Sequence, residues 1–545
     1  MPTMQTKSSL IILSFCALTS SAWAEVKPNA LFSDNAVLQQ NAKVPVWGAA
    51  APNESVTVEF AGQKKTTAAD AQGNWKVTLD PMPASAAVRD LTITGNLKSQ
   101  ISNVKCANVL VGEVWVCSGQ SNMAWPLKQA GNAATETPTA NYPKLRMFTV
   151  TQKTALFPQS ELTGKWVECS PATVGNFSAV GYFFGRDIHK ATGAPVGMVH
   201  TSWGGTPAES WTSITGMEKD PSLHGYVETV KSLIENHDAA SAKLPQEMAA
   251  YQAKLKVWNE KVGWPLKKAD EAWAKENAKN LAEGKPTVRR PEPSEPRPTP
   301  PASLDGGNHG PTTLYNAMIA PLIPYAIKGA IWYQGESNAG KGFEYRTLFP
   351  RMIADWREKW GQGDFPFLFV QLAPLGDRWT TVWEAQLLTW KKTLNTGMAV
   401  TTDVGGSLHP LQKEPVGARL ALAARAVAYG EKVEYSGPEY DSFKIDQGRV
   451  IISFKHLGGG LVAKDGPLNG FTMAGADKKF LPAKAEIQGD TVVVTSEKIT
   501  SPVAVRYLWV RGSEMNLWNK AGLPASPFWT DPESLTDDAP APKNR

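Results

Sequence analysis

Four short loops rich in glycine and small polar residues each follow an apolar run in the sequence. They read SGQSNM, SWGGTPAESW, YQGESNAG and DVGGSLHP. The first contains Ser121, close behind the apolar run VWVC. A serine where a strand turns into a loop exposes its hydroxyl, as hydrolase nucleophiles do, although the G-x-S-x-G form is absent. Taken alone, Ser121 would more often be a turn residue, so the rest of the chain has to support a nucleophile.

A serine nucleophile needs a neighbouring base to accept its proton. Of the seven histidines, His409 lies in one of these four loops, just before a predicted helix. A histidine in that position is more often a cap or a surface residue, but its place opposite Ser121 favours a catalytic base. The other histidines fall in predicted strands, helices or separate regions: His189, His200, His224, His237, His309 and His456.

The elements that would position these loops alternate after Val111 between strands and amphipathic helices. Continuous apolar strands between helices are typical of a parallel sheet covered on both faces. In such sheets functional groups gather at the carboxyl ends of the strands, so all four loops are expected on one rim. The predicted strands lie at 114–116, 195–203, 328–336, 365–373 and 398–406, and the predicted helices at 179–192, 345–360, 383–394 and 414–429.

Three further regions differ from this alternating pattern. Residues 25–107 and 431–545 contain short runs rich in Val and Thr between turn residues, which predicts an accessory β-sandwich region at each end. Residues 217–310 interrupt the α/β part with a helical stripe and the Pro-rich run KPTVRRPEPSEPRPTPP. We expect a helical insertion tied down by this run, inside a catalytic domain over 108–430. The stripe, Tyr251, Leu255, Trp258 and Val262, is expected to pack against its own domain.

The first 24 residues have the features of a secretory signal: Lys7, an apolar stretch and an A-x-A site before Glu25. We therefore expect a periplasmic or secreted protein with no membrane association after the signal is removed. A net charge of +5 without a basic stripe does not indicate a nucleic-acid partner. Cys106, Cys117 and Cys169 match no metal pattern and are expected to be buried small hydrophobes.

Six ordered motifs carry a resemblance to a known family: GEVWVCSGQSNM, SWGGTPAESW, LYNAMIAPL, GAIWYQGESN, HPLQKEPVGARLAL and GLPASPFWTD. Together they resemble the sialate O-acetylesterase family among SGNH-type carbohydrate esterases, from about residue 31 to 531. The resemblance implies an SGNH-hydrolase-like parallel sheet flanked by helices. It also implies that Ser121 is the nucleophile and His409 the base.

The chain departs from the family where an acid is expected. The family commonly has D-I-H-P around its histidine, and Ser407 stands here in place of that Asp. A carboxylate that orients such an imidazole can be worth about 10⁴ in rate. Asp403, at the end of the preceding strand, is the candidate substitute, and an Asp that caps its own turn is an equally good interpretation. Without a substitute the enzyme would work as a Ser/His dyad.

The resemblance also implies hydrogen-bond donors for the oxyanion that forms during the reaction. Loss of one such donor typically lowers turnover by about 10²–10³. They would be the Ser121 N–H, an N–H of Gly204 or Gly205, and a side-chain amide of Gln334 or Asn338. Glu336 is expected to orient loop N–H groups or bind sugar hydroxyls. Several tryptophans flank the loops and could face sugar rings or belong to the core: Trp125, Trp203, Trp211, Trp332 and Trp383.

The predicted function is a carbohydrate acetylesterase that releases acetate through a serine acyl-enzyme and needs no metal or organic cofactor. Its partner is an acetylated carbohydrate, either O-acetyl sialic acid or a plant hemicellulose such as xylan or xyloglucan. The 20 tryptophans and the extra modules favour the plant glycans. The alternative is a catalytically impaired carbohydrate-binding protein of the same fold. The sequence gives no indication of an oligomeric state.

Overall fold

The computed structural model describes residues 26–97, 100–375, 379–509 and 515–531. The expected signal segment, 1–24, lies outside these residues. No helix in the described ranges is both long and apolar enough to cross a membrane.

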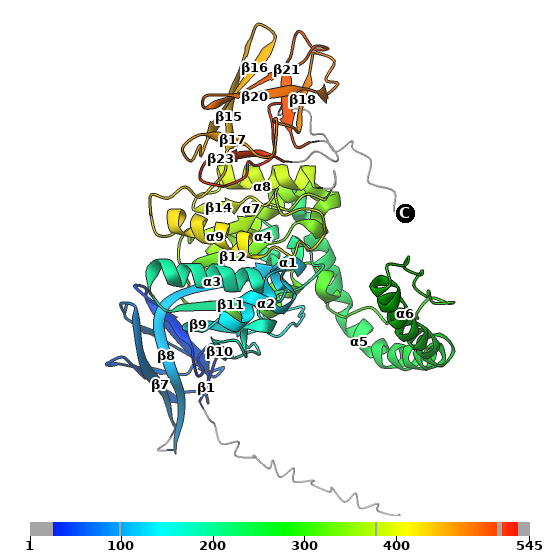
Figure 1. The fold of residues 1–545 in the computed structure, drawn as a ribbon. Helices are drawn as coiled ribbons and strands as arrows, with labels where there is room; N and C mark the ends of the chain where they lie inside the picture. The colour runs from blue at the N-terminus through cyan, green and yellow to red at the C-terminus, as the bar shows by residue number, and fades with distance from the viewer. Residues whose placement is uncertain (1–25, 98–99, 376–378, 510–514, 532–545) are drawn as a thin grey trace, which may run out of the picture.

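A central sheet of mainly parallel strands forms the middle of the molecule (Figure 1). Its neighbouring strands pair in parallel except at one edge, where β10 runs antiparallel to β9. In spatial order the strands are β10 (Trp166–Cys169), β9 (Tyr142–Thr149), β11 (Val196–Ser202), β8 (Gln100–Gly119), β12 (Gly329–Tyr333), β13 (Phe367–Val370) and β14 (Thr396–Ala399). The sheet and its helices confirm the predicted α/β class.

The strand order places β8, the first of these strands in the chain, inside the sheet. From β8 the chain builds β11 on one side, then crosses to β12, β13 and β14 on the other. This winding creates a switch point between β8 and β12, where ligands of open α/β sheets bind beyond the carboxyl ends of the strands. The loops that follow these two strands are SGQSNM and YQGESNAG.

Helices cover both faces of the sheet. Cys117 of β8 faces α3 (Ala179–Thr192), because a methyl group on Gly181 would lie 3.1 Å from its sulfur. The next residue of β8, Ser118, pairs with Trp332. Trp332 packs against Phe349 and Trp356 of α7 (Gly342–Trp360) on the opposite face, with ring centroids 6.4 and 5.9 Å apart. Successive strand residues point to opposite faces, so α3 and α7 lie on different sides.

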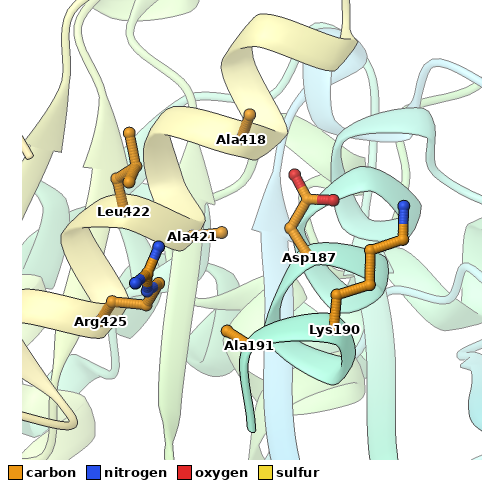
Figure 2. Close-up of a pocket in the computed structure, with 7 residues that line it drawn as sticks. All are labelled: Asp187, Lys190, Ala191, Ala418, Ala421, Leu422 and Arg425. Atoms are coloured by element: carbon orange, nitrogen blue, oxygen red, sulfur yellow. The ribbon is translucent and has the colours of Figure 1, made fainter. Parts of the chain in front are cut away.

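Two more helices complete the layers: α8 (Thr380–Lys392) packs on α7, and α9 (Glu414–Val427) packs on α3. The contact of α9 with α3 is close, since a methyl group on Gly417 would lie 2.5 Å from Cβ of Phe183. Figure 2 shows the outer part of this helix pair. There Asp187 and Lys190 of α3 line a surface pocket together with Ala418 and Leu422 of α9.

Strand β8 also joins the N-terminal β region to the central sheet. Its first half pairs antiparallel with β7 (Ser85–Leu97), and its second half pairs in parallel with β11 and β12. The expected domain boundary at residue 107 therefore falls inside one strand, and both regions share a single hydrophobic core. The remaining N-terminal strands are β1 (Lys27–Pro28), β2 (Val37–Gln39), β3 (Val44–Ala49), β4 (Ser55–Phe60), β5 (Gln63–Ala68) and β6 (Asn74–Leu79).

The C-terminal β region has a hydrophobic core of its own. Figure 1 shows it at the opposite end of the central sheet from the N-terminal strands, so the two β regions do not pack on each other. Its larger sheets are β15 (Glu439–Asp446), β16 (Arg449–Lys455), β21 (Thr491–Thr495) and β20 (Lys484–Gln488), and β19 (Leu481–Pro482), β18 (Phe471–Ala474), β22 (Ala504–Tyr507) and β24 (Phe528–Trp529). A smaller, two-stranded sheet consists of β17 (Leu461–Ala463) and β23 (Leu517–Asn519).

The insertion forms a helical arm that projects from the body (Figure 1). It contains α5 (His224–Trp258) and α6 (Trp264–Ala282), whereas α4 (Ile214–Met217) precedes it and packs against α7 in the body. The Pro-rich run lies along this arm. Trp258 and Trp273 donate their indole N–H groups to the Glu295 and Val288 carbonyls, at 3.0 and 2.9 Å. These contacts hold the run as the strap that its composition predicts.

Candidate active site

Ser121 lies at the carboxyl end of β8 and begins the short helix α1 (Ser121–Ala124). The strand ends at Gly119, whose φ is +133°, and a methyl group there would lie 2.2 Å from the Tyr333 carbonyl oxygen. Only glycine permits this approach of β8 to β12. The Gln120 N–H donates to the same carbonyl at 2.9 Å, and the Trp203 N–H donates to Gly119 at 3.1 Å. Both neighbouring strands therefore fix the backbone just before Ser121.

His409 reaches Ser121 from the loop that joins β14 to α9. Its Nε2 lies 2.8 Å from the Ser121 Oγ. The loop is anchored beside α1, because the Leu411 carbonyl accepts from the Gly131 N–H at 2.9 Å and the Leu408 carbonyl from the Asn122 amide at 3.0 Å. The structure thus brings together the two residues that were predicted as nucleophile and base.

The surroundings of His409 favour its uncharged form. Burial and the nearby Lys413 charge lower the pKa of His409 below its ordinary value of 6.5. The Trp125 ring stacks on the imidazole, with centroids 5.0 Å apart and planes 25° apart. A neutral imidazole whose Nε2 accepts from Ser121 carries its proton on Nδ1, which is the tautomer of a general base.

Asp403 is not placed as the orienting acid of His409. Both of its carboxylate oxygens accept from the Arg419 guanidinium of α9, at 2.6 and 2.7 Å. A bidentate pair of this kind holds a carboxylate in one orientation. In the described ranges no acidic side chain hydrogen-bonds to His409; its backbone N–H donates to the Ser407 hydroxyl at 3.2 Å.

The two candidate glycines lie in different surroundings. A methyl group on Gly204 would lie 3.3 Å from Cβ of Ser121, so this backbone borders the hydroxyl. At Gly205 the nearest atom to such a methyl group is Nε2 of His309, at 3.9 Å. Gly205 has a φ of +76° and serves the turn. Gly204 is therefore the glycine that borders the reacting group.

Gln334 and Asn338 are both buried and hydrogen-bonded to each other. Gln334 uses both amide protons, on the Thr206 carbonyl at 3.2 Å and the Asn338 Oδ1 at 2.6 Å. The Asn338 amide nitrogen donates to Glu209 at 2.9 Å, its one hydrogen bond to the described residues. Asn338 thus retains an amide proton for another acceptor, whereas Gln334 does not.

A buried polar network lies beside Ser121 and His409, and it was not predicted from the sequence. Asn122, directly after Ser121, donates to Glu336 at 2.5 Å and accepts from the Lys413 ammonium. Burial raises the pKa of Glu336 and lowers the pKa of Lys413 to about 7. The residues that could have indicated this network in the sequence are the Asn in SGQSNM and the Lys four residues after His409.

The flanking tryptophans divide into two groups. Trp211, Trp332 and Trp383 are buried in the core, whereas Trp125 and Trp203 are half-buried beside the loops. The three described cysteines are free and buried, and burial raises the pKa of Cys106 and Cys169 to about 12. Within the described ranges no group of three or more His, Cys, Asp or Glu side chains could hold a metal ion.

A serine hydroxyl in contact with an imidazole at the switch point of an α/β sheet is an arrangement that can perform nucleophilic ester hydrolysis. Comparison with known proteins agrees. Residues 304–414 match the family model described as a carbohydrate esterase, sialic acid-specific acetylesterase. Rat sialate O-acetylesterase is 32% identical over 438 residues, which are 72% of each chain, and its human counterpart is 28% identical over 559 residues, or 93% of this chain and 92% of that one.

A crystal structure of XAC1771, described as a novel carbohydrate acetylesterase from Xanthomonas citri, is also similar. It has a TM-score of 0.73 and 35% sequence identity, and the match covers 93% of this chain and 100% of that one. The chain belongs to the sialate O-acetylesterase family. It is therefore a carboxylic ester hydrolase of the carbohydrate esterase type.

Proposed function

We propose that this protein is an exported carbohydrate O-acetylesterase that uses Ser121 as its nucleophile and His409 as its base. The observation that carries the proposal is the 2.8 Å contact between the Ser121 Oγ and the His409 Nε2. Membership of an acetylesterase family supports the reaction type.

The reaction follows the acyl-enzyme route. His409 accepts the Ser121 proton while the Ser121 oxygen attacks the acetyl carbonyl. The tetrahedral intermediate collapses, the sugar oxygen leaves with the proton held on His409, and an acetyl-serine remains. Water then loses a proton to His409 and attacks the acetyl carbon. The bond from this carbon to the Ser121 oxygen breaks, His409 returns the proton to that oxygen, and acetate is released. Because no described carboxylate bonds to His409, the pair works as a dyad whose base is kept neutral by the lowered pKa.

Three donors are proposed for the oxyanion. The Ser121 N–H and the Gly204 N–H border the reacting oxygen, as the closeness of Gly204 to Ser121 supports. The third is the Asn338 side chain, since the Gln334 amide protons are both taken by other groups. Donors fixed before the reaction stabilise the developing charge without reorganisation.

The substrate is proposed to be an acetylated plant hemicellulose such as xylan or xyloglucan. Aromatic faces bind the apolar faces of sugar rings, and half-buried Trp125 and Trp203 adjoin the loops that carry the site. Acetate release from acetylated xylan and xyloglucan fragments is compared with release from O-acetyl sialic acid. Faster turnover of the hemicellulose fragments supports this assignment, and release from the sialic acid alone contradicts it.

The cell compartment is proposed from the first 24 residues. Lys7, the apolar stretch from Leu10 to Leu18 and the A-x-A site before Glu25 are the parts of an exported signal. Cleavage there gives a periplasmic or secreted enzyme. Sequencing the N-terminus of the protein recovered from the exported fraction tests both the export and the cleavage position.

The mechanism is tested with Ser121→Ala. Acetate release from a chromogenic acetate ester is measured for wild type and variant, with circular dichroism as the check on folding. We expect a folded variant whose turnover falls by about 10⁴ or more, because the nucleophile is lost. A folded variant that retains wild-type turnover contradicts the assignment of Ser121.

A further inference from the structure

Asn122 connects three loops of the active-site rim through one side chain. It follows Ser121 in the chain and is 1% exposed. Its Nδ2 donates to the Leu408 carbonyl at 3.0 Å and to Glu336 at 2.5 Å, and its Oδ1 accepts from the Lys413 Nζ. Leu408 immediately precedes His409. Asn122 therefore lies next to the nucleophile in sequence and holds the residue before the base in space.

The chemistry of the three partners selects an amide at this position. The Lys413 ammonium only donates, and the Leu408 carbonyl only accepts, as does the Glu336 carboxylate. Only a side chain with one acceptor oxygen and two donor protons satisfies all three. The isosteric Asp would place a second carboxylate beside Glu336 and leave the Leu408 carbonyl without a donor.

Charged and aromatic groups enclose this amide. Lys413 is 1% exposed, and its Nζ lies 5.7 Å from the Trp125 ring centroid and 5.4 Å from that of Tyr333. Trp125 also stacks on His409. The second oxygen of Glu336 is buried and has no hydrogen-bond partner in the described part of the chain. A network so enclosed has little freedom to rearrange, because a new arrangement would leave a buried charge unpaired.

We propose that Asn122 is a positioning residue for His409. By donating to the Leu408 carbonyl, it fixes the backbone of the loop so that Nε2 of His409 meets the Ser121 Oγ. In this enzyme the loop contact supplies the orientation that a carboxylate on Nδ1 supplies in a triad. The inference rests on the proposed function of Ser121 and His409.

The first variant is Asn122→Asp, with kcat and KM measured on the chromogenic acetate ester. We expect kcat to fall by about 10²-fold while KM stays within about threefold, because a displacement of 1 Å in a reacting group costs about that much. Melting temperature is measured in parallel. The Ser121→Ala variant, assayed beside it, separates this inference from the mechanism itself. Activity of Ser121→Ala contradicts the mechanism, whereas a dead Ser121→Ala with a fully active Asn122→Asp contradicts only the inference.

The double variant Asn122→Asp with Glu336→Gln separates positioning from simple stability. It keeps the total charge of the network, and its Gln amide can donate to the new carboxylate, but the Leu408 carbonyl still lacks its donor. We expect the melting temperature to return toward wild type while kcat stays at least about tenfold lower. Recovery of kcat to within about threefold of wild type overturns the proposal.

Glu336→Gln alone is the matched control, since it leaves the contact of Asn122 with Leu408 in place. Because Glu336 belongs to the same network, we expect its kcat to fall by about fivefold, a smaller loss than that of Asn122→Asp. A loss of about 10²-fold in this variant, equal to that of Asn122→Asp, overturns the proposal because the charge and not the loop contact would then be required. This outcome is decisive even where the double variant does not fold.

Discussion

Replacing Ser407 with Asp would supply the carboxylate that the described residues do not place on His409. The side chain at 407 already borders the base, because its hydroxyl accepts from the His409 backbone N–H at 3.2 Å. We expect a carboxylate two residues before the histidine, at the position of the Asp in the family pattern, to reach Nδ1. We therefore expect Ser407→Asp to change both the basicity of His409 and the turnover.

The size of the effect follows from the charges around the imidazole. An opposite charge within about 4–6 Å shifts a pKa by about 1–3 units, and the half-buried position of His409 favours about 1 unit, or about 1.4 kcal/mol. In the wild type, burial and Lys413 lower the pKa of His409, so activity is lost only as the pH falls below the ordinary value of 6.5. A carboxylate raises that pKa. In the pH profile of kcat/KM, the fall in activity on the acidic side, called the acidic limb, should therefore lie about 1 pH unit higher for the variant. Above this limb kcat should rise by about tenfold, because the carboxylate also stabilises the imidazolium.

The assay is kcat/KM for the chromogenic acetate ester from about pH 5 to 9, where the limbs report the free enzyme. Ser407→Asn is the control, since it has nearly the same size as Asp and no charge. An acidic limb and a turnover that are the same in the Asp and Asn variants would contradict this expectation. They would show that position 407 does not reach the imidazole.

Two further substitutions test the assignments around the pair. Asp403→Asn should lower the free energy of unfolding by about 1–3 kcal/mol, because the Arg419 guanidinium keeps the Val400 carbonyl but loses its charged bidentate partner, while kcat stays within a few fold. Urea unfolding and turnover measure the two effects, and a loss of turnover of 10³ or more with normal stability would return Asp403 to the role of orienting acid. Gly204→Ala should reduce turnover by about 10²-fold with little change in stability, because its methyl group would contact Cβ of Ser121 at 3.3 Å. Unchanged turnover in that variant would move the oxyanion away from this loop.

Local sequence signals were sufficient for several elements. The helix predicted over 179–192 has these bounds in the structure, because Ser178 caps its start by accepting from the Gly181 N–H and Gly193 ends it at a φ of +69°. Ser121 and His409 could be predicted because each follows an apolar strand and both loops open on the same rim. Capping residues and strand ends act over a few neighbours, so the sequence contains their whole signal.

Features that depend on distant partners could not be read in this way. The carboxylate of Asp403 binds Arg419, which lies 16 residues away on α9, and no local pattern distinguishes that partner from His409. The amide protons of Gln334 are taken by the Thr206 carbonyl, 128 residues away, and by Asn338. The continuity of β8 was also not evident, because an apolar strand gives no sign that its pairing changes from antiparallel to parallel along its length.

In the proposed mechanism the acetyl group passes through a covalent bond to Ser121. The most direct measurement is peptide mass analysis of the enzyme after acid quenching within one turnover of an activated acetate ester. We expect an acetyl group on the peptide that contains Ser121 and its disappearance when turnover is complete. An acetyl group on another residue, or acetate release at full rate with no acetylated peptide at any time, would contradict it.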